Sequence, residues 1–477
     1  MQELTTDVVI LGAGTAGLNA RREVERAGKD WLLVEPGPGG TTCARVGCMP
    51  SKLLIAAAEA AWSARHAEAF GVRVAGVEVD GRAVLERVRR ERDRFTGFVH
   101  AGVDRLPADR RIPGRGRLQG PTTVLVDDHT TIQAGAVVIA TGSAPWVPPG
   151  FEAVAELVHT TDTIFELPDL PRRMAVIGAG IIGLELGQAF ARLGVEVVVV
   201  EAADGVMGIA DAAVAGPAEA LIRRDLELHL GIRPQPAERD GDAARVVWED
   251  TDGARHTRTV DLVLVATGRR PNLAGLGLDT LGVPLDRRGM PPIDADTLQI
   301  ADLPVFVAGD AEPRRPLLHE ASDEGAIAGC NAARFPVIHR GRRRVPLAIA
   351  FTEPQLGTVG ERIDPAEHPE LAVGEVSYAD QGRARVMARG EGLARLYADR
   401  ATGRLVGATI LAPHAEHLAH LVAWAVADGL TVTEALERPF YHPVLEEGLR
   451  TALRRLLKEL GAEHMAPPQT CVDCPGE

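Results

Sequence analysis

Short apolar runs, separated by glycine-rich turns and amphipathic stretches, recur along the chain. The run at 7–11 (DVVIL) leads into a glycine-rich turn, a stretch of helical period and a second apolar run at 31–35. The same order returns at 174–177, which leads through another such turn and helix to the run at 195–201. Short apolar runs bounded by turn signals predict buried strands. Because each pair of runs flanks one helix, the pattern predicts two strand–helix–strand units.

Both glycine-rich turns have the spacing of a dinucleotide-binding turn. In each copy an acidic residue follows the first glycine by 23 positions. The glycines let the turn close and let the backbone approach a pyrophosphate, and the acid bonds ribose hydroxyls. Two complete copies in one chain are a strong signal, and we expect two dinucleotide sites. Their residues are Gly12, Gly14, Gly17 and Glu35 in the first unit, and Gly178, Gly180, Gly183 and Glu201 in the second.

The order of the apolar runs also predicts the domain organisation. Each unit has a later run ending in Ala-Thr-Gly, at 137–142 and 262–268, and a third run follows at 305–310. We therefore expect an α/β fold with two Rossmann-like domains, the second inserted in the first, and an α+β C-terminal domain. The expected limits are 1–145 and 270–345 for the first, 146–269 for the second, 346–463 for the C-terminal domain and 464–477 for a flexible tail.

Composition and charge exclude several classes of function. The chain has 477 residues, 45% of them hydrophobic and 25% charged, which is ordinary for a globular protein of several domains. A net charge of −14 argues against nucleic acids and anionic membranes as partners. No apolar stretch reaches the ~18 residues of a membrane span, and the acidic start is unlike a signal peptide. With only five cysteines, we expect a cytoplasmic protein.

Two cysteines directly after the first unit are the strongest chemical signal. Cys43 and Cys48 lie in the run 40–52 (GTTCARVGCMPSK), where the unit would deliver them to a bound dinucleotide. On a regular helix they would lie about 140° apart, too far for a disulfide, but Gly47 permits an irregular backbone. A pair of buried small hydrophobes is the alternative, and an iron–sulfur site lacks its third cysteine. We interpret the pair as a redox-active disulfide.

This run resembles the active-site segment of the flavoprotein disulfide reductases, such as dihydrolipoyl dehydrogenase, glutathione reductase and mercuric reductase. Their usual pattern is Gly-Gly-Thr-Cys-x-x-x-Gly-Cys-x-Pro-Ser-Lys. Here Thr41 replaces the second glycine and Ala44-Arg45 replaces Leu-Asn, while the cysteine spacing and the Pro-Ser-Lys ending are intact. The resemblance covers residues 3 to about 462 in the family's order.

The resemblance implies FAD in the first unit, a nicotinamide cofactor in the inserted unit and a homodimer made by the C-terminal domain. It makes Cys43 the thiol that exchanges with substrate and Cys48 the thiolate against the flavin, both with a lowered pKa. Asp310 matches the aspartate that bonds the ribityl chain, and His319 matches the start of the helix aimed at the pyrimidine end. The other cofactor-binding matches are Thr42, Lys52, Thr141, Gly142 and Gly268.

Lys52 is singled out by composition as well as by position. The chain has 49 arginines and only three lysines, so a lysine kept beside the cysteines indicates a chemical requirement that arginine does not meet. Glu185 would by default be a solvated acid on a nucleotide-binding helix. In the resembling family a glutamate at this place pairs with the lysine of Pro-Ser-Lys, and we expect the pair Lys52–Glu185 here.

Glu201 predicts the choice of nicotinamide cofactor. An acid at this position accepts hydrogen bonds from both adenosine ribose hydroxyls and repels a 2′-phosphate. The residues that follow it, 202–205, contain no arginine. We therefore expect NAD(H) to be preferred over NADP(H).

A second stretch of chemical interest is His442-Pro443 with an acid, Glu447, five residues after the histidine. A lone histidine is more often structural, but this spacing matches the family motif in which the histidine moves the thiol proton and the glutamate orients the imidazole. Val444 and Glu446 depart from the usual Thr and Ser, and Phe440 replaces a common histidine. In the family this histidine reaches the disulfide of the other subunit.

Three further groups have weaker signals. His414, His417 and His420 are spaced so that no single helical face holds all three, and we expect a polar edge of an interface helix rather than a metal site. Cys330 is expected to be a small packed residue. The tail pair Cys471 and Cys474 is compatible with a relay dithiol, half of a zinc site or no function.

Together these features predict a homodimeric FAD-dependent, NAD-linked disulfide oxidoreductase closest to dihydrolipoyl dehydrogenase, acting on a lipoyl-bearing protein or a small dithiol. An NAD(P)H-dependent disulfide or mercuric reductase is the enzymatic alternative, although mercuric reductases place a tyrosine where His442 stands. A flavin-binding redox sensor without turnover is the alternative from another class. Such a sensor needs no proton shuttle.

Overall fold

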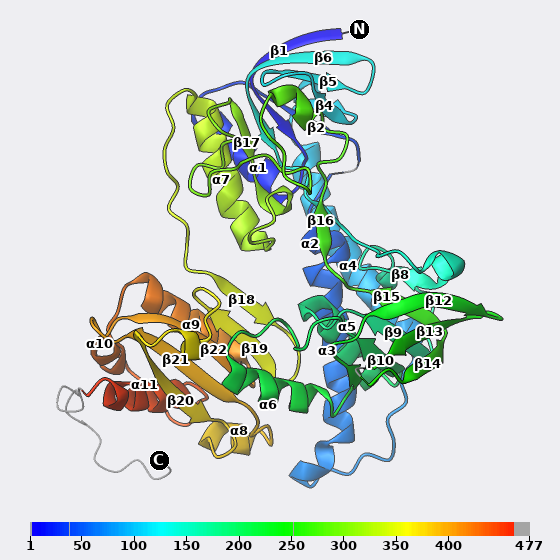
Figure 1. The fold of residues 1–477 in the computed structure, drawn as a ribbon, viewed down its shortest axis with the longest axis vertical. Helices are drawn as coiled ribbons and strands as arrows, with labels where there is room; N and C mark the ends of the chain where they lie inside the picture. Colours follow the sequence, from blue (N-terminus) through cyan, green and yellow to red (C-terminus); the bar gives the residue numbers. More distant parts are fainter. Residues whose placement is uncertain (1, 38, 251, 462–477) are drawn as a thin grey trace.

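The computed structural model describes residues 2–37, 39–250 and 252–461. Its first sheet forms the upper part of the molecule in Figure 1 and has the order β3-β2-β1-β6-β5-β4, with β17 also paired to β6. β1 runs parallel to β2 and β6 on either side of it. The strands are β1 (Gln2–Leu11), β2 (Trp31–Glu35), β3 (Arg111–Pro113), β4 (Gly116–Leu118), β5 (Thr123–Val126), β6 (Thr130–Ile139) and β17 (Val305–Val307).

Two helices far apart in sequence cover one face of this sheet. Val8 and Ile10 of β1 point toward α1 (Thr15–Arg26) and α7 (Leu318–Arg334), while the alternate residues of β1 belong to the core on the other face. The two helices lie so close together that a Cβ on Gly325 of α7 would stand only 2.2 Å from the carbonyl oxygen of Ala16. Glycine at this position is therefore what allows the contact. The first unit is therefore completed by chain that follows the second, as the sequence predicts.

The second sheet is entirely parallel among the described residues and lies lower right in Figure 1. Its order is β11-β10-β9-β15-β8, and α5 (Ile181–Arg192) follows β9 through the second glycine-rich turn. A three-stranded antiparallel sheet packs beside it. The strands are β8 (Val158–His159), β9 (Arg173–Ile177), β10 (Glu196–Val200), β11 (Glu227–His229), β15 (Leu262–Val265), and β12 (Pro234–Asp240), β13 (Ala243–Glu249) and β14 (Arg255–Val260).

A short two-stranded ladder joins the two units. β7 (Ser143–Pro145) pairs antiparallel with β16 (Arg269–Pro271), and the register sets Pro145 opposite Arg269. The chain therefore leaves the first unit and returns to it at one place. We propose that this ladder marks the limits of the inserted domain near 145 and 270.

The C-terminal part contains a five-stranded antiparallel sheet of order β18-β19-β22-β21-β20 with helices packed on it, at lower left in Figure 1. The tail cysteines Cys471 and Cys474 lie outside the described residues. The elements are β18 (Leu347–Ala350), β19 (Gln355–Val359), β20 (Leu371–Ser377), β21 (Leu393–Asp399), β22 (Leu405–Ala412), α9 (Ala415–Ala427), α10 (Val432–Leu436) and α11 (Glu447–Glu459).

Long helices in the middle of the molecule connect these parts. The short helix α2 (Thr42–Val46) is followed by α3 (Cys48–Arg65) and, after a loop, by α4 (Gly81–Asp104). Leu54 of α3, Leu85 of α4 and Leu184 of α5 are fully buried in one apolar cluster, so α3 ties the cysteine segment to the second unit. Within 2–37, 39–250 and 252–461, none of the helices has the length and apolarity needed to cross a membrane.

Candidate active site

The backbone around the two cysteines changes direction between two helices. The hydroxyl of Thr41 caps α2 by accepting a hydrogen bond from the N–H of Ala44 at 3.1 Å. α2 ends at Val46, and α3 begins at Cys48 after the single residue Gly47. A Cβ on Gly47 would stand 3.2 Å from the Cα of Cys43, so glycine is what allows the close approach. The departure of Thr41 from the family pattern thus supplies a helix cap.

A hydrogen bond between the two thiols shifts their pKa values in opposite directions. Both cysteines are free, with Cys43 half-buried and Cys48 exposed. The hydrogen bond from Cys43, with help from the nearby Lys52 ammonium, lowers the pKa of the Cys48 thiol to about 7 despite partial burial. The same hydrogen bond and burial raise the pKa of Cys43. The expectation that both thiols have a lowered pKa is therefore wrong for Cys43, because the donor of the shared proton must keep it.

The expected ion pair between Lys52 and Glu185 is present. Nζ of Lys52 lies 2.7 Å from Oε2 of Glu185, a carboxylate that is only 4% exposed. The other carboxylate oxygen, Oε1, accepts a hydrogen bond at 2.8 Å from the backbone N–H of Phe351. The Phe351 ring also lies under the ammonium, with Nζ 4.5 Å from its centroid. Phe351, which follows β18, was missed by the sequence analysis because no local motif indicates such a contact.

A histidine–carboxylate dyad stands at the start of α11. Nδ1 of His442 lies 2.9 Å from Oε1 of Glu447, and Oε2 of Glu447 accepts a hydrogen bond from the N–H of Val444 at 3.1 Å. An ionised carboxylate only accepts, so Nδ1 carries a proton and Nε2 is left as the basic nitrogen. His442 is 60% exposed, whereas Glu447 is 17% exposed. The imidazole is therefore accessible as a base to a group that lies outside its own domain.

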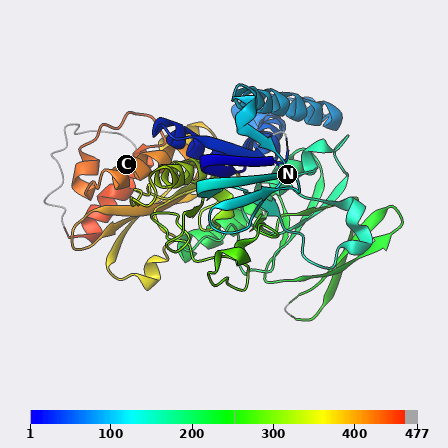
Figure 2. The same cartoon turned by 90° about the horizontal axis from the view of Figure 1, so that it is seen from above.

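Within one chain the dyad and the thiol pair are far apart. Figure 1 shows α2 in the centre of the molecule and α11 at its lower left edge, and Figure 2 shows from above that the red C-terminal helix lies at one side of the molecule. A single chain thus holds two halves of the expected site, in agreement with a base that serves the thiols of another subunit.

In each glycine-rich turn the two outer glycines are tightly packed against the backbone, whereas the middle glycine has open space beside it. In the first turn a Cβ on Gly12 would stand 2.3 Å from the carbonyl oxygen of Ala140, and one on Gly17 would stand 1.9 Å from that of Gly12. Gly14 between them has nothing within 4 Å. The second turn repeats this, with Gly178 at 2.6 Å and Gly183 at 2.0 Å from backbone oxygens and nothing near Gly180. Packing therefore explains the outer glycines, and an approaching ligand explains the middle ones.

The acids of both units point back at their own turns. Oε2 of Glu35 accepts a hydrogen bond from the N–H of Ala13 at 2.7 Å, and Oε2 of Glu201 accepts one from Ala179 at 2.6 Å. A cavity of about 300 Å³ opens beside Glu35 and is also lined by Ala13, Gly37 and Gly39. This space lies where the adenosine end of a dinucleotide is expected in the first unit.

The remaining cofactor candidates lie on several elements: Thr141 and Gly142 follow β6, Asp310 follows β17, and Gly268 follows β15 of the second unit. The hydroxyl of Thr141 is buried and finds no hydrogen-bond partner among the described residues, as expected of a group awaiting a ligand. Asp310 accepts a hydrogen bond from the Ser143 hydroxyl at 2.8 Å. Gly142 and Gly268 have positive φ and open space beside them. Thr42 is the first residue of α2, and His319 is exposed in the first turn of α7. These residues fit a bound flavin dinucleotide.

Cys330 on α7 belongs to none of these groups. Its sulfur accepts a contact from Nη1 of Arg334 at 2.7 Å, one helical turn away, and it is half-buried. The expectation of a packed small residue is compatible with this place in the helix.

Two dinucleotide units, a thiol pair beside the first and a histidine dyad in a third domain define a flavin-dependent disulfide oxidoreductase. The model of the pyridine nucleotide-disulphide oxidoreductases matches residues 6–325, and that of their dimerisation domain matches residues 346–453. The chain belongs to this family. Its cofactors are accordingly FAD and NAD(H), and its C-terminal part is of the type that forms homodimers.

Known relatives are similar over nearly their whole length. The chain is 33% identical to a dihydrolipoyl dehydrogenase of Synechocystis sp., covering 95% of this chain and 99% of the relative. It is 32% identical to one of Thermus scotoductus, covering 95% and 98%. Among solved structures, LpdA of Mycobacterium tuberculosis superposes with a TM-score of 0.82 at 26% identity, covering 94% and 99%. The flavoprotein disulfide reductase RclA of Escherichia coli, in complex with Cu(II), has the same fold, with a TM-score of 0.80 at 22% identity, covering 94% and 99%.

Two substitutions in the first turn should separate packing from cofactor binding. Gly17→Ala places a methyl group against a backbone oxygen and should destabilise even the cofactor-free protein by about 3 kcal/mol or more. Gly14→Ala has room and should cost less than about 1 kcal/mol in the cofactor-free protein, yet it should lose FAD. Thermal unfolding with and without FAD, and the FAD content after purification, measure both. Normal FAD affinity in Gly14→Ala would contradict the assignment of the first turn.

The Lys52–Glu185–Phe351 contacts should set the acidity of Cys48. In a Cys43→Ser background, Lys52→Met removes the positive charge and should raise the pH of half-maximal iodoacetamide alkylation of Cys48 by about one pH unit. Phe351→Leu should cause a smaller rise, because the ring no longer holds the ammonium while the backbone N–H still holds Glu185. Phe351→Tyr is the matched control. An unchanged profile in Lys52→Met would show that the ion pair does not act on this thiol.

Proposed function

We propose that the protein oxidises a dihydrolipoyl dithiol and reduces NAD⁺, as a dihydrolipoyl dehydrogenase does. The observation that carries the proposal is the His442–Glu447 dyad, a base held in place by its carboxylate, in a chain that also holds the free thiols of Cys43 and Cys48 beside Lys52. A redox sensor has no use for such a base. Relatives called dihydrolipoyl dehydrogenase, similar over almost the whole chain, support the choice of substrate.

The residues of the chain account for each proton and sulfur in the exchange. His442 Nε2 takes the proton of a substrate thiol, with the imidazolium stabilised by Glu447. The substrate thiolate attacks Sγ of Cys43 in the oxidised enzyme, and Cys48 leaves as a thiolate next to Lys52. The second substrate thiol attacks the substrate sulfur of the mixed disulfide, its proton passes to the departing Cys43 sulfur, and the oxidised substrate is released. Cys43 is left as a thiol and Cys48 as a thiolate, with no bond between them, as in the structure, where both cysteines are free.

A bound FAD would supply a two-electron acceptor for this dithiol and a hydride donor for NAD⁺. Gly12, Gly14, Gly17, Glu35 and Asp310 would hold it, and Lys52 with Glu185 would lie beside the reacting sulfur. The second unit would hold NAD⁺ through its own glycine turn and Glu201. Because the dyad lies far from the thiols of its own chain, the active species in this proposal is the homodimer, with a lipoyl-bearing protein or a small dithiol as partner.

The choice among disulfide chemistries is open to a direct comparison. Steady-state kcat/KM for dihydrolipoamide with NAD⁺ should exceed the values for glutathione disulfide and for mercuric ion with NADH or NADPH. The retained His442 favours an organic dithiol, since its role is to move a thiol proton. A higher value for either alternative substrate would replace the proposed activity by the corresponding reductase.

His442→Gln tests the proton shuttle. It should lower dithiol turnover by about 10²–10⁴-fold, the usual contribution of a general base. Electron transfer from NADH to an artificial acceptor should be largely retained, because it needs no thiol proton. Equal losses in the two assays would assign His442 a structural role only.

Glu201→Ala tests the choice of nicotinamide. The Glu201 carboxylate should favour NAD(H) through the ribose hydroxyls and disfavour NADP(H) through repulsion of the 2′-phosphate. The wild type should therefore prefer NAD(H) by kcat/KM, and Glu201→Ala should reduce that preference by about tenfold or more. Glu196→Ala, an exposed acid on the same strand β10, is the matched control. A wild-type preference for NADP(H) would overturn the assignment.

A further inference from the structure

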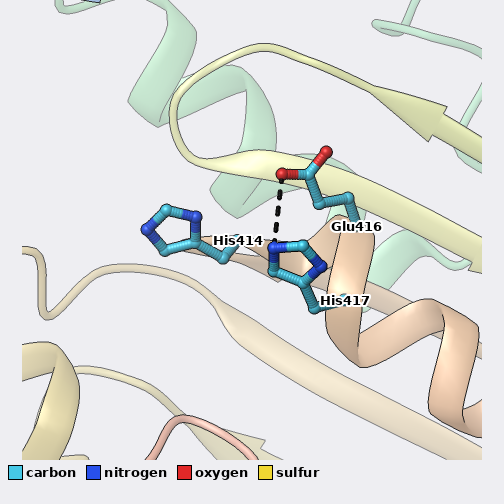
Figure 3. Close-up of side chains that lie close together, drawn as sticks. All are labelled: His414, Glu416 and His417. Carbon is cyan, nitrogen blue, oxygen red and sulfur yellow. Dashed lines mark ion pairs between the residues drawn. The ribbon is translucent and has the colours of Figure 1, made fainter.

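Three potential metal ligands meet at the start of α9. The side chains of His414, Glu416 and His417 place one ligand atom each within 4.8 Å of one another, as Figure 3 shows. His414 and His417 are exposed and Glu416 is half-buried. Nε2 of His417 lies 3.7 Å from Oε1 of Glu416, and the two imidazole rings are nearly parallel. The cluster lies in the part of the chain that matches the dimerisation model.

The local backbone explains why these residues meet although a helical wheel separates them. His414 is not part of the helix but is its N-cap residue, in the left-handed region at φ 52°. N-cap and N3 side chains face each other at a helix start, which sets His414 opposite His417. Glu416 is held in place through its N–H, which donates to Oε1 of Gln355 on β19 at 3.0 Å. A helical wheel assumes that all three histidines lie within the helix, so the spacing in the sequence did not predict this pairing.

His420, the third histidine of the series, does not take part in the cluster. Nδ1 of His420 lies 2.6 Å from the backbone oxygen of Glu416, so its ring is bound to the preceding helical turn. The third ligand of the cluster is therefore Glu416 and not His420. This difference supplies a natural control, because His417 and His420 are both exposed on the same helix.

The donors have the chemistry of a site for a borderline divalent cation. Two imidazole nitrogens and a carboxylate suit Zn²⁺, Cu²⁺ or Ni²⁺ rather than Mg²⁺ or Ca²⁺. With bonds of about 2.0–2.1 Å, tetrahedral ligands lie roughly 3.3 Å apart. Exposed side chains reach that spacing by rotation about their own bonds. The fourth position is left to water, and the Glu416 carboxylate offsets the unfavourable field of the helix N-terminus.

We propose that His414, Glu416 and His417 bind one divalent cation of the zinc class per chain. Bound there, the ion fixes the N-cap of α9 and, through Glu416 and Gln355, the contact of that helix with β19. The site is separate from the thiol pair and from the His442–Glu447 dyad, and it does not depend on the proposed substrate.

The test must exclude thiol ligation. The full-length, FAD-loaded dimer, oxidised so that Cys43 and Cys48 are joined and carrying Cys330→Ser, Cys471→Ser and Cys474→Ser, is freed of metal with a chelator. It is then titrated with Zn²⁺ by calorimetry, and with Co²⁺ to read the ligand type from its visible absorption. One Zn²⁺ per chain is expected, with a tetrahedral Co²⁺ spectrum free of sulfur charge-transfer bands.

Single substitutions then locate the ion. His414→Ala and His417→Ala should each weaken Zn²⁺ binding by about tenfold or more, and Glu416→Gln should also weaken it. His420→Ala should leave the affinity within about twofold. The proposal is overturned if no saturable binding occurs, or if His420→Ala weakens binding as much as His417→Ala does. Circular dichroism and thermal unfolding of the metal-free variants confirm that each is folded, and Glu416→Gln tests the site without altering either histidine.

Discussion

The ion pair between Lys52 and Glu185 is the contact on which the arrangement of the active site depends. Glu185 is almost fully buried, and among residues 2–37, 39–250 and 252–461 its carboxylate is bound by Lys52 and by the N–H of Phe351. Losing one partner of such a pair costs up to about 3–5 kcal/mol, because the other is left buried and unpaired. The three residues lie on α3, on α5 and after β18. One interaction therefore fixes the thiol segment against both the second unit and the C-terminal domain.

The far end of α3 is held by a second set of charges. The guanidinium groups of Arg192 and Arg389 both lie near the ring of Trp62, each 5.0 Å from its centroid. Arg389 also contacts Glu59 of α3 and bonds Glu353 at 3.0 Å. Burial raises the pKa of Glu353 to about 7, which the arginine only partly offsets. α3 is thus clamped at both ends between the same neighbours, and Cys48 at its first position has a fixed place.

Features governed by local sequence were predictable, and features governed by tertiary contact were not. The glycine turns, the strand–helix–strand units around them and the His442–Glu447 spacing each follow from residues close in the chain. The Lys52–Glu185 pair spans 133 positions and was reached only through family resemblance. Phe351 and the cap at Thr41 carried no signal, because their roles depend on what lies opposite them. The raised pKa of Cys43 was missed because acidity was assigned to each thiol separately, although the two share one proton.

The charge of Lys52 also bears on which sulfur the substrate would attack. In thiol–disulfide exchange the better leaving group is the thiol of lower pKa. Neither sulfur of the disulfide carries a proton, so the Lys52 ammonium near Cys48 is the group that would stabilise Cys48 as the leaving thiolate. In the proposed mechanism the substrate therefore attacks Cys43, and the substrate thiol needs a base before it can do so. One histidine is sufficient for this chemistry, and it need reach only Sγ of Cys43. In the proposed homodimer, a base carried on the C-terminal domain of one subunit would meet that requirement without disturbing the charges that hold Cys48 of the other.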